Sequence, residues 1–271
     1  MKTKKTQKEK RREVDKKAIK REGQEDKIEK KLEKQVIKEL KEETKEIKEK
    51  TKKEREREAE LDSWVPKTKL GKEVKGGKIK EIDYVFENNL RILEPYIVDI
   101  LIPNIESDLI HIGQAKGKFG GGKRRPWRQT QKKTAEGNVP SFACMAVVGD
   151  KNGHAGLGYG KAKETVPAKQ KAISKAKINL IRIERGCGSF ECVCNEKHSI
   201  PFVVEGKSGS VKIKLMPAPK GTGLVIDDEC KKILKLAGIK DVYSKSFGKT
   251  RTKFNFAKAC MSALKKLNKY V

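Results

Sequence analysis

The sequence predicts an α+β protein in which a charged N-terminal extension precedes two folded parts. The middle of the chain shows an apolar run, turn residues, a second alternating run and then helical spacing, which is the order of a β-hairpin followed by a helix. The C-terminal part again mixes strand and helix patterns. The first 60 residues instead contain no aromatic residue and no proline, as is typical of a segment that builds no globular core.

Residues 1–62 are expected to form a helical or disordered extension. By count, residues 1–60 hold 24 Lys and Arg against 17 Asp and Glu, so they carry +7 of the net charge of +28. Pairs such as Glu13–Lys17 favour a solvated helix. The apolar stripe from Ile28 to Leu40 leaves a coiled-coil partner helix open as an alternative, but it is too thin for a core.

Residues 63–93 are expected to be a linker followed by one helix. Residues 62–79 are rich in Gly and Lys, which indicates a linker. Helical spacing of apolar residues then predicts a helix that ends before Pro95. Residues 96–102 form a further piece, extended or helical. The inner face of the predicted helix consists of Ile82, Val85, Phe86, Leu90 and Leu93.

Residues 94–183 are expected to form the first folded domain. The segment "SFACMAVVGD" is apolar at both alternating sets of positions, which predicts a strand buried on both faces. "DKNG" predicts a hairpin turn in which Asn and Gly accept positive φ, and "HAGLGYGKA" is the returning strand. Residues 165–184 predict a helix whose inner face consists of Ala168, Ala172, Ile173, Ala176 and Leu180.

Residues 184–271 are expected to form a separate α/β domain. Residues 200–206 and 210–219 are predicted strands. "DDECKKILKLAG" predicts a helix with acidic residues at its start and Gly238 at its end, as the helix dipole and the left-handed cap favour. A short strand and a final helix, "FNFAKACMSALKKLNKY", complete the pattern.

The excess of positive charge is the strongest bulk property. The chain holds 65 Lys and Arg against 37 Asp and Glu, which indicates a polyanionic partner, most commonly nucleic acid. A membrane-surface helix would show a wide apolar face against a basic one, and no apolar run reaches the ~18 residues of a membrane span. The start shows no secretory signal. We therefore expect a cytoplasmic protein with no membrane partner.

The glycine-rich stretch from Gly149 to Thr165 looks like a nucleotide-binding loop, but it fails both common glycine patterns for phosphate binding. Gly156, Gly158 and Gly160 leave one strand face without side chains, so an RNA backbone or a packed helix could approach it closely. The two interpretations are compatible, because the RNA backbone would lie against the sheet edge and the start of the following helix. The RNA-contacting residues predicted around this hairpin are Lys151, Asn152, His154, Tyr159, Lys161 and Lys163.

A second basic stretch, the expanded loop at 113–138, has no core pattern. Cations interleaved with aromatic residues predict contacts to phosphates and stacking on unpaired bases, and the alternative is a disordered, solvated loop. The residues predicted to bind RNA are Lys116, Lys118, Phe119, Lys123, Arg124, Arg125, Trp127, Arg128, Lys132 and Lys133.

The segment "CGSFECVCNEKH" brings together the ligand types of a structural zinc site. Cys187, Cys192, Cys194 and His198 supply three sulfurs and one nitrogen. Their spacing is not the usual paired knuckle, so free thiols in a surface loop remain the alternative. The other three cysteines lie in strand or helix patterns and are expected to be buried.

The residues of the hairpin and of several later motifs resemble the small-subunit ribosomal protein five family. The resemblance rests on "GDKNGHAGLGYGKAKETVPAKQKA", "MPAPKGTG", "LAGIKDVYSKSFG" and "NFAKACMSAL", and "RGCGSFECVCNEKHSIPF" is similar to the archaeal type. It covers about Glu94 to Leu267. The long extension and the expanded loop depart from the family pattern.

This resemblance implies a double-stranded-RNA-binding-like domain followed by a βαβα-type C-terminal domain. It further implies a structural constituent of the small ribosomal subunit, without catalytic activity or a small-molecule substrate. Such a protein would bind small-subunit rRNA near the mRNA entrance and decoding region, beside neighbouring ribosomal proteins, and support translational accuracy. A free-standing regulator that binds double-stranded RNA is the alternative, and a phosphotransfer enzyme would rest on fold analogy alone.

Overall fold

The computed structural model describes residues 59, 61, 63–115, 124–192, 194 and 196–268. The chain divides into two compact units, Met1–Trp64 and Val65–Val271. The expectation for the extension at 1–62 lies almost entirely outside the described residues, and the division at 93 and 183 stays a prediction. Among the described helices, none combines the length and the hydropathy that a segment crossing a bilayer requires.

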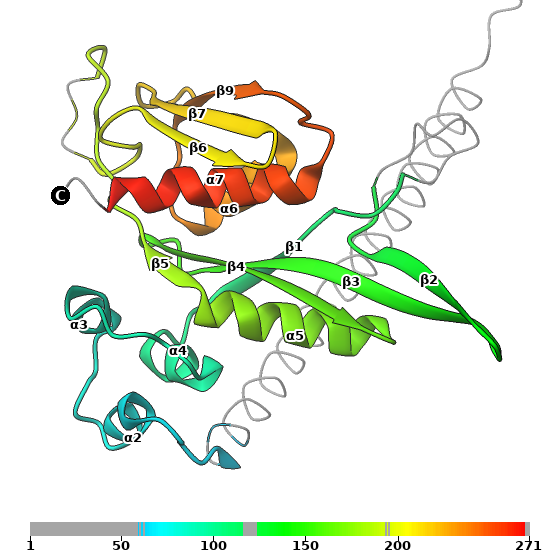
Figure 1. Cartoon of the computed structure of the whole chain (residues 1–271). Coiled ribbons are helices and arrows are strands. Elements are labelled where there is room, and N and C mark those ends of the chain that lie inside the picture. The colour runs from blue at the N-terminus through cyan, green and yellow to red at the C-terminus, as the bar shows by residue number, and fades with distance from the viewer. Residues whose placement is uncertain are drawn as a thin grey trace, which may run out of the picture. The chain divides into compact units, whose positions relative to one another are not determined.

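Between Lys69 and Leu101, three short helices precede the first sheet (Figure 1), namely α2 (Lys69–Lys75), α3 (Ile82–Glu87) and α4 (Pro95–Leu101). The sequence predicts only a linker where α2 lies. Its first turn is stabilised by Thr68, whose Oγ1 accepts a hydrogen bond from the Gly71 N–H at 3.0 Å. Pro95 does not merely end a helix but begins α4, because the first turn needs no N–H from it.

The helix predicted over 82–93 ends at Glu87. Asn88 caps it and Asn89 takes φ of 51°, a left-handed conformation that Asn adopts more readily than most residues. Leu90 and Leu93 are consequently exposed by 41% and 63%. Their helical spacing was misleading because the two asparagines turn the chain before the apolar pattern stops.

The first sheet contains five antiparallel strands. Its order is β1-β3-β4-β5, and β2 pairs with β3 alone. β1 and β2 occupy successive parts of the same edge of β3, which is 13 residues long. The strands are β1 (Glu106–Ile110), β2 (Arg128–Thr134), β3 (Gly137–Gly149), β4 (His154–Ala162) and β5 (Leu180–Arg182).

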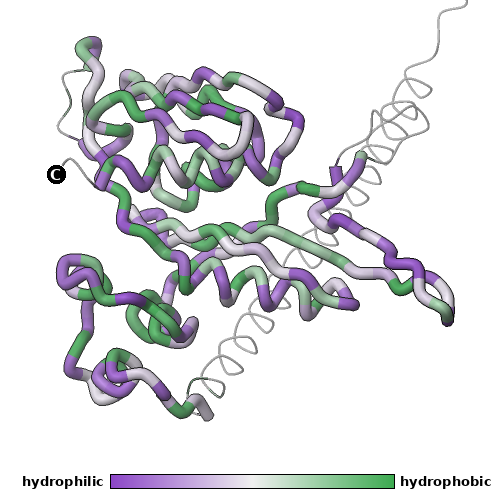
Figure 2. Tube along the Cα trace, in the orientation of Figure 1, coloured by the Kyte–Doolittle hydropathy of each residue, from purple (hydrophilic) through white to green (hydrophobic). Residues whose placement is uncertain are grey.

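β2 and the first part of β3 form a hairpin arm that extends beyond the rest of the sheet (Figure 1). The sequence predicts an expanded loop at 113–138, and this prediction is wrong for residues 128–134. Every residue of β2 is exposed, and Figure 2 shows hydrophilic colours along much of it. A strand with water on both faces has no apolar alternation, so the pattern that identifies most strands is missing.

The glycine-bearing face of β4 is covered by α5 (Thr165–Ile178). A Cβ atom on Gly156 would lie 2.2 Å from the Ala176 carbonyl oxygen, and one on Gly158 would lie 2.1 Å from that of Ala172. The glycine face of β4 therefore allows the backbone of α5 to pack directly against the strand. The interpretation in which the glycines allow tight packing of the helix on the sheet is confirmed, and the RNA contact predicted at the sheet edge stays a prediction.

The inner face of α5 is confirmed for Ala168, Ala172 and Ala176, which are fully buried. The helix ends earlier than predicted, at Ile178, with Asn179 as its cap. Leu180 belongs instead to β5, which pairs antiparallel with the start of β4. β5 is only three residues long. A segment this short has no sequence pattern that distinguishes a strand from the last turn of a helix.

The turn between β3 and β4 differs in one detail from the prediction. Lys151 takes φ of 63° and Gly153 takes φ of 107°, whereas Asn152 does not have positive φ. The Asp150 carboxylate accepts hydrogen bonds from the N–H groups of Asn152 at 2.8 Å and His154 at 3.1 Å. These bonds hold the turn.

The second sheet has four strands in the order β6-β7-β9-β8. The prediction of mixed strands and helices is confirmed, while β8 is a two-residue strand that the sequence did not reveal. β8 runs parallel to β9 and the other pairs are antiparallel. The elements are β6 (Val204–Ser208), β7 (Val211–Pro217), β8 (Leu224–Val225), α6 (Asp228–Leu236), β9 (Val242–Phe247) and α7 (Lys253–Leu267).

The two sheets share one apolar core. α6 and α7 lie between them, while α5 covers the far face of the first sheet (Figure 1). Met145 and Val147 of β3 belong to the same buried cluster as Ile233 of α6 and Leu264 of α7. The odd-numbered residues of β3 thus face the second domain and the even-numbered ones face α5, which explains why both sets are apolar.

Candidate nucleic-acid interface and metal centre

Basic residues of the arm lie on an exposed, regular surface. Arg128, Lys132 and Lys133 lie on β2 and are all exposed. In the ladder, Arg128 is opposite Ala143 on β3, and Ala143 is opposite Lys161 on β4. These residues form one row across three strands, so the two cations project from the same face of the sheet. Such a row can contact successive phosphates.

The base of the loop before β2 is closed by backbone bonds. The Gly113 N–H donates to the Arg125 carbonyl at 2.8 Å, and Ala115 forms an isolated bridge with Arg124. The Arg124 Nη1 donates to the Arg251 carbonyl at 3.2 Å, so the loop base is tied to the C-terminal domain. The Arg125 side chain is exposed.

Trp127 has a structural role that the sequence analysis did not foresee. It is partly buried against the cluster formed by Cys144, Ala146, Ala168 and Ala172. Its ring therefore stabilises the sheet–α5 layer and is less available for stacking on a base. The predicted RNA contacts from Lys116 to Lys123 lie outside the described residues.

His154 is not a surface contact, contrary to the prediction. The residue is 7% exposed. Nδ1 lies 2.6 Å from an Asp150 carboxylate oxygen, and Nε2 lies 3.1 Å from an Asp83 carboxylate oxygen. Burial acts to lower the pKa of His154, but the bonds to Asp150 and Asp83 outweigh it and raise that pKa. His154 therefore joins α3 to the turn.

The remaining predicted contacts divide between the two ends of β4. Lys151 and Asn152 lie exposed in the turn before the strand, and Lys163 lies exposed just after it. A nine-residue strand is about 30 Å long, so one small ligand cannot contact both ends. Tyr159 is partly exposed and packs edge-on against Phe254 of α7, with ring centroids 5.3 Å apart.

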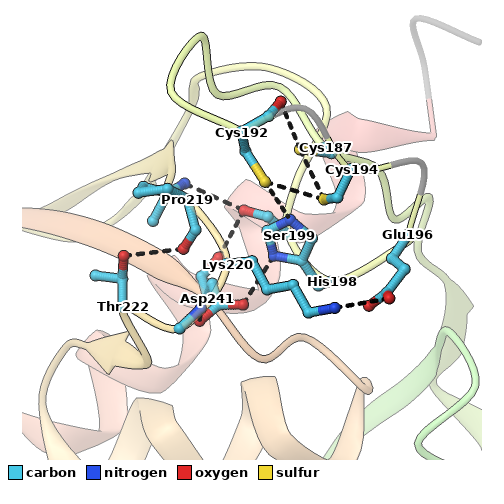
Figure 3. A network of polar contacts seen from close by, with 12 residues as sticks. Cys187, Cys192, Cys194, Glu196, His198, Ser199, Pro219, Lys220, Thr222 and Asp241 are labelled. Carbon is cyan, nitrogen blue, oxygen red and sulfur yellow. Dashed lines mark hydrogen bonds and ion pairs between the residues drawn. The ribbon is translucent and has the colours of Figure 1, made fainter.

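The four residues predicted to bind metal converge in one place (Figure 3). Their ligand atoms all lie within 4.8 Å of one another. The Cys192 Sγ lies 3.6 Å from the His198 Nε2, and the Cys194 Sγ lies 3.6 Å from the Cys187 Sγ. A tetrahedral zinc ion separates its sulfur and nitrogen ligands by about 3.6–3.8 Å, so the cluster could hold a metal ion.

The thiols of Cys192 and Cys194 also shift each other's pKa. Cys192 and Cys194 place their sulfurs 3.0 Å apart. The hydrogen bond with Cys194 lowers the pKa of Cys192 to about 6, and the same bond raises the pKa of Cys194 to about 11. A thiolate is the metal-binding form of cysteine, so at least one ligand is ready for a metal at neutral pH.

Asp241 supports the cluster from behind (Figure 3). One carboxylate oxygen lies 2.8 Å from the His198 Nδ1. The other accepts backbone N–H bonds from Gly221 at 3.1 Å and Gly223 at 2.8 Å. Since the residue is 4% exposed, it holds the imidazole with Nε2 toward the sulfurs, as outer-shell carboxylates do in metal sites.

Backbone bonds close the loop that carries the cysteines. The Gly186 N–H donates to the Ser199 carbonyl, and the Ser199 N–H donates to the Gly186 carbonyl, both at 2.9 Å. The Ser199 hydroxyl donates to the Asp241 carbonyl at 2.6 Å. Asp241 was not predicted from the sequence, because its role depends on a contact with His198, 43 positions away.

Comparisons with known proteins agree with this architecture. Residues 127–184 match the family described as "Ribosomal protein S5, N-terminal domain", and residues 206–271 match "Ribosomal protein S5, C-terminal domain". Proteins named "Small ribosomal subunit protein uS5" are similar across most of their length. The one from Nanoarchaeum equitans is 53% identical over 77% of this chain and 89% of its own, and the one from Methanocaldococcus jannaschii is 49% identical over the same shares.

Proposed function

Because this chain belongs to the S5 family of small-subunit ribosomal proteins, we propose that it is a structural constituent of the small ribosomal subunit that binds rRNA and performs no catalysis. The observation that carries the proposal is the exposed cationic row of Arg128 and Lys161 on a rigid sheet. It combines fixed geometry with a basic chain of net charge +28.

The proposed mechanism is placement and charge neutralisation. The ladder between β2 and β3 fixes Arg128, Lys132 and Lys133 in position, so little ordering of the arm is needed on binding. The arm and the loop base would reach rRNA near the mRNA entrance and decoding region, beside neighbouring ribosomal proteins. Through that placement the protein would support decoding accuracy and reside on cytoplasmic ribosomes.

The arginines at the base of the arm provide the test. Replacing Arg124, Arg125 and Arg128 with Ala should reduce the slope of log affinity against log salt by about 2 to 3, since each lost phosphate contact contributes about 0.7–0.9. The matched control removes three exposed lysines elsewhere, Lys207, Lys212 and Lys265. An unchanged slope in the arginine variant would contradict the assignment.

The particle in which the protein resides distinguishes the alternative function. A constituent of the small subunit should co-sediment with small-subunit particles in extracts of the source cells. A free-standing regulator that binds double-stranded RNA would stay in the light fractions at the same salt concentration. Sedimentation in those fractions alone would reject the structural role.

We further propose that Cys187, Cys192, Cys194 and His198 hold one structural zinc ion. The donor set and its spacing fit zinc, and all four positions are taken by protein ligands, as in closed structural sites. After purification without chelators, elemental analysis should find about one zinc per chain. Cys192→Ser should lose it, whereas Cys144→Ala, at a buried cysteine outside the cluster, should keep it. A zinc-free wild-type protein with reactive thiols would favour the free-cysteine alternative.

A further inference from the structure

The cysteine ligands of the metal cluster differ from the other cysteines of the chain in their access to solvent. Cys187, Cys192 and Cys194 are all partly exposed, and Phe190 in the same loop is fully exposed. The other three cysteines are completely buried, namely Cys144, Cys230 and Cys260. A dissolved reagent can therefore reach the sulfurs of the loop but not those of the core.

Two of the loop sulfurs lie closer together than a metal ion requires. The Cys192 Sγ is 3.0 Å from the Cys194 Sγ. Two sulfurs that share one tetrahedral zinc ion lie about 3.8 Å apart, whereas a disulfide bond joins them at about 2.05 Å. The pair lies between these two geometries. The Cys187 Sγ, in contrast, is 3.6 Å from the Cys194 Sγ, which is near the metal-bound separation.

We propose that Cys192 and Cys194 form a redox-modification site, at which hydrogen peroxide closes a disulfide bond and the cluster releases its zinc ion. The inference rests on the proposed zinc site and adds its regulation. The three sulfurs and one nitrogen that fit a metal ion also place two oxidisable sulfurs in contact with each other. Binding the metal and forming the bond use the same two atoms, so they exclude each other.

The chemistry takes two steps. One sulfur of the pair attacks a peroxide oxygen, breaks the O–O bond and becomes a sulfenic acid, while the other oxygen leaves as water. The second sulfur then attacks the first and displaces its oxygen as a second water. The pair has lost two electrons, the peroxide has gained them, and two protons come from solvent. Cys187 and His198 alone remain as ligands, too few for a closed structural site.

The fold around the cluster does not depend on the two oxidised sulfurs. His198 keeps its bond to Asp241 at 2.8 Å, and its carbonyl accepts from the Lys240 N–H at 2.8 Å. The paired backbone bonds between Gly186 and Ser199 close the loop below the cysteines. Oxidation should therefore change the loop and its metal content while the domain stays folded. A dithiol reductant should reverse the change by thiol–disulfide exchange.

The test follows zinc and thiols together in the full chain. Zinc-loaded protein receives limiting hydrogen peroxide beside a chromophoric chelator that is too weak to remove zinc from the untreated protein. Wild type should release about one zinc per chain. Thiols counted after denaturation should fall from six to four, because two of the six enter the bond. Peptide mapping by mass spectrometry should find Cys192 linked to Cys194, and a dithiol reductant should restore all thiols and zinc binding.

Two matched variants separate the disulfide from the metal. Cys187→Ser and Cys194→Ser each remove one ligand and should both lose zinc. Only Cys187→Ser keeps the close pair, so it should still form the Cys192–Cys194 bond under the same limiting peroxide. Cys194→Ser should keep its thiols. If Cys194→Ser formed a bond as readily as Cys187→Ser, any two thiols of the loop would suffice and the inference would be overturned.

The outcomes also distinguish this site from the proposed zinc site. Wild-type protein that contains no zinc but forms the Cys192–Cys194 bond would refute the zinc site and leave the redox pair standing. Zinc-loaded protein that keeps both its metal and its six thiols under peroxide would leave the zinc site standing and refute the redox pair. A mapped bond from Cys187, or from a buried cysteine, would refute it as well.

Discussion

Adding one methyl group to the glycine stripe should separate α5 from the first sheet. In Gly158→Ala, the new Cβ atom would lie 2.1 Å from the Ala172 carbonyl oxygen and 2.3 Å from the Ala176 nitrogen. Both are backbone atoms of α5, so no side chain can rotate away. Since ordinary contacts of a Cβ atom exceed about 3 Å, the helix must move by roughly 1 Å.

The magnitude follows from two opposing effects. Overpacking a well-packed site costs about 1–3 kcal/mol, and a backbone clash belongs at the upper end. Replacing Gly by Ala also restricts the unfolded chain, which offsets about 0.4–1 kcal/mol. The net loss of about 2 kcal/mol should lower Tm by about 4–8 °C for a folded part of this size.

Thermal unfolding followed by circular dichroism measures this shift. The control is Gly76→Ala, where the nearest atom is the Lys72 carbonyl oxygen at 3.2 Å, and its Tm should change little or rise. A Gly158→Ala protein that melts at or above the wild-type Tm would show that α5 does not need the glycine stripe, and our account of this face would fail.

Two further predictions concern Asp241 and the pair formed by His154 and Asp150. Asp241→Asn should lower zinc affinity by about 10–100-fold, the usual effect of losing an outer-shell partner, because one amide oxygen cannot accept from the His198 Nδ1–H and from both glycine N–H groups. Competition with a chromophoric chelator measures the affinity, and the control variant Glu205→Gln should behave as wild type. Equal affinities of Asp241→Asn and wild type would exclude the positioning role of Asp241. The pKa of His154 is raised in the folded state, so its contribution to stability is complete below its ordinary pKa of about 6.5 and is lost as pH rises through the raised value. Burial acts to raise the pKa of Asp150, but the bonds from His154 and Asn152 outweigh it and lower that pKa. The contribution of Asp150 to stability is therefore lost as pH falls through the lowered value. Urea unfolding of wild type and His154→Gln from about pH 5 to about pH 9 should therefore show the decline at high pH only in wild type, and parallel curves would refute the role of this histidine.

The core of the fold could be predicted from the sequence because its elements have strong periodicity. Ala168, Ala172 and Ala176 were assigned correctly to the inner face of α5, and all are fully buried. The final helix was also predicted, and Phe256 and Leu264 on its apolar face are buried. Where apolar spacing and burial coincide over three or more turns, few alternative structures remain.

The errors arose where contacts between distant residues decide the structure. β2 is exposed on both faces and is held only by its ladder with β3, so it has no apolar signature. His154 follows a turn and looks like a surface residue, yet Asp83 lies 71 positions away and covers it. The convergence of the three cysteines and His198 could be predicted because they lie within one short segment, whereas the contact of His198 with Asp241 could not.

The single apolar cluster that spans both sheets has a consequence for the integrity of the molecule. Met145 and Val147 of the first sheet pack with residues of α6 and α7, so a fragment without the second domain would expose them to water. Neither domain has a complete interior by itself, and the folded part should therefore gain or lose its structure as one cooperative body. The two ends of β4 would then keep a fixed separation for as long as the protein stays folded.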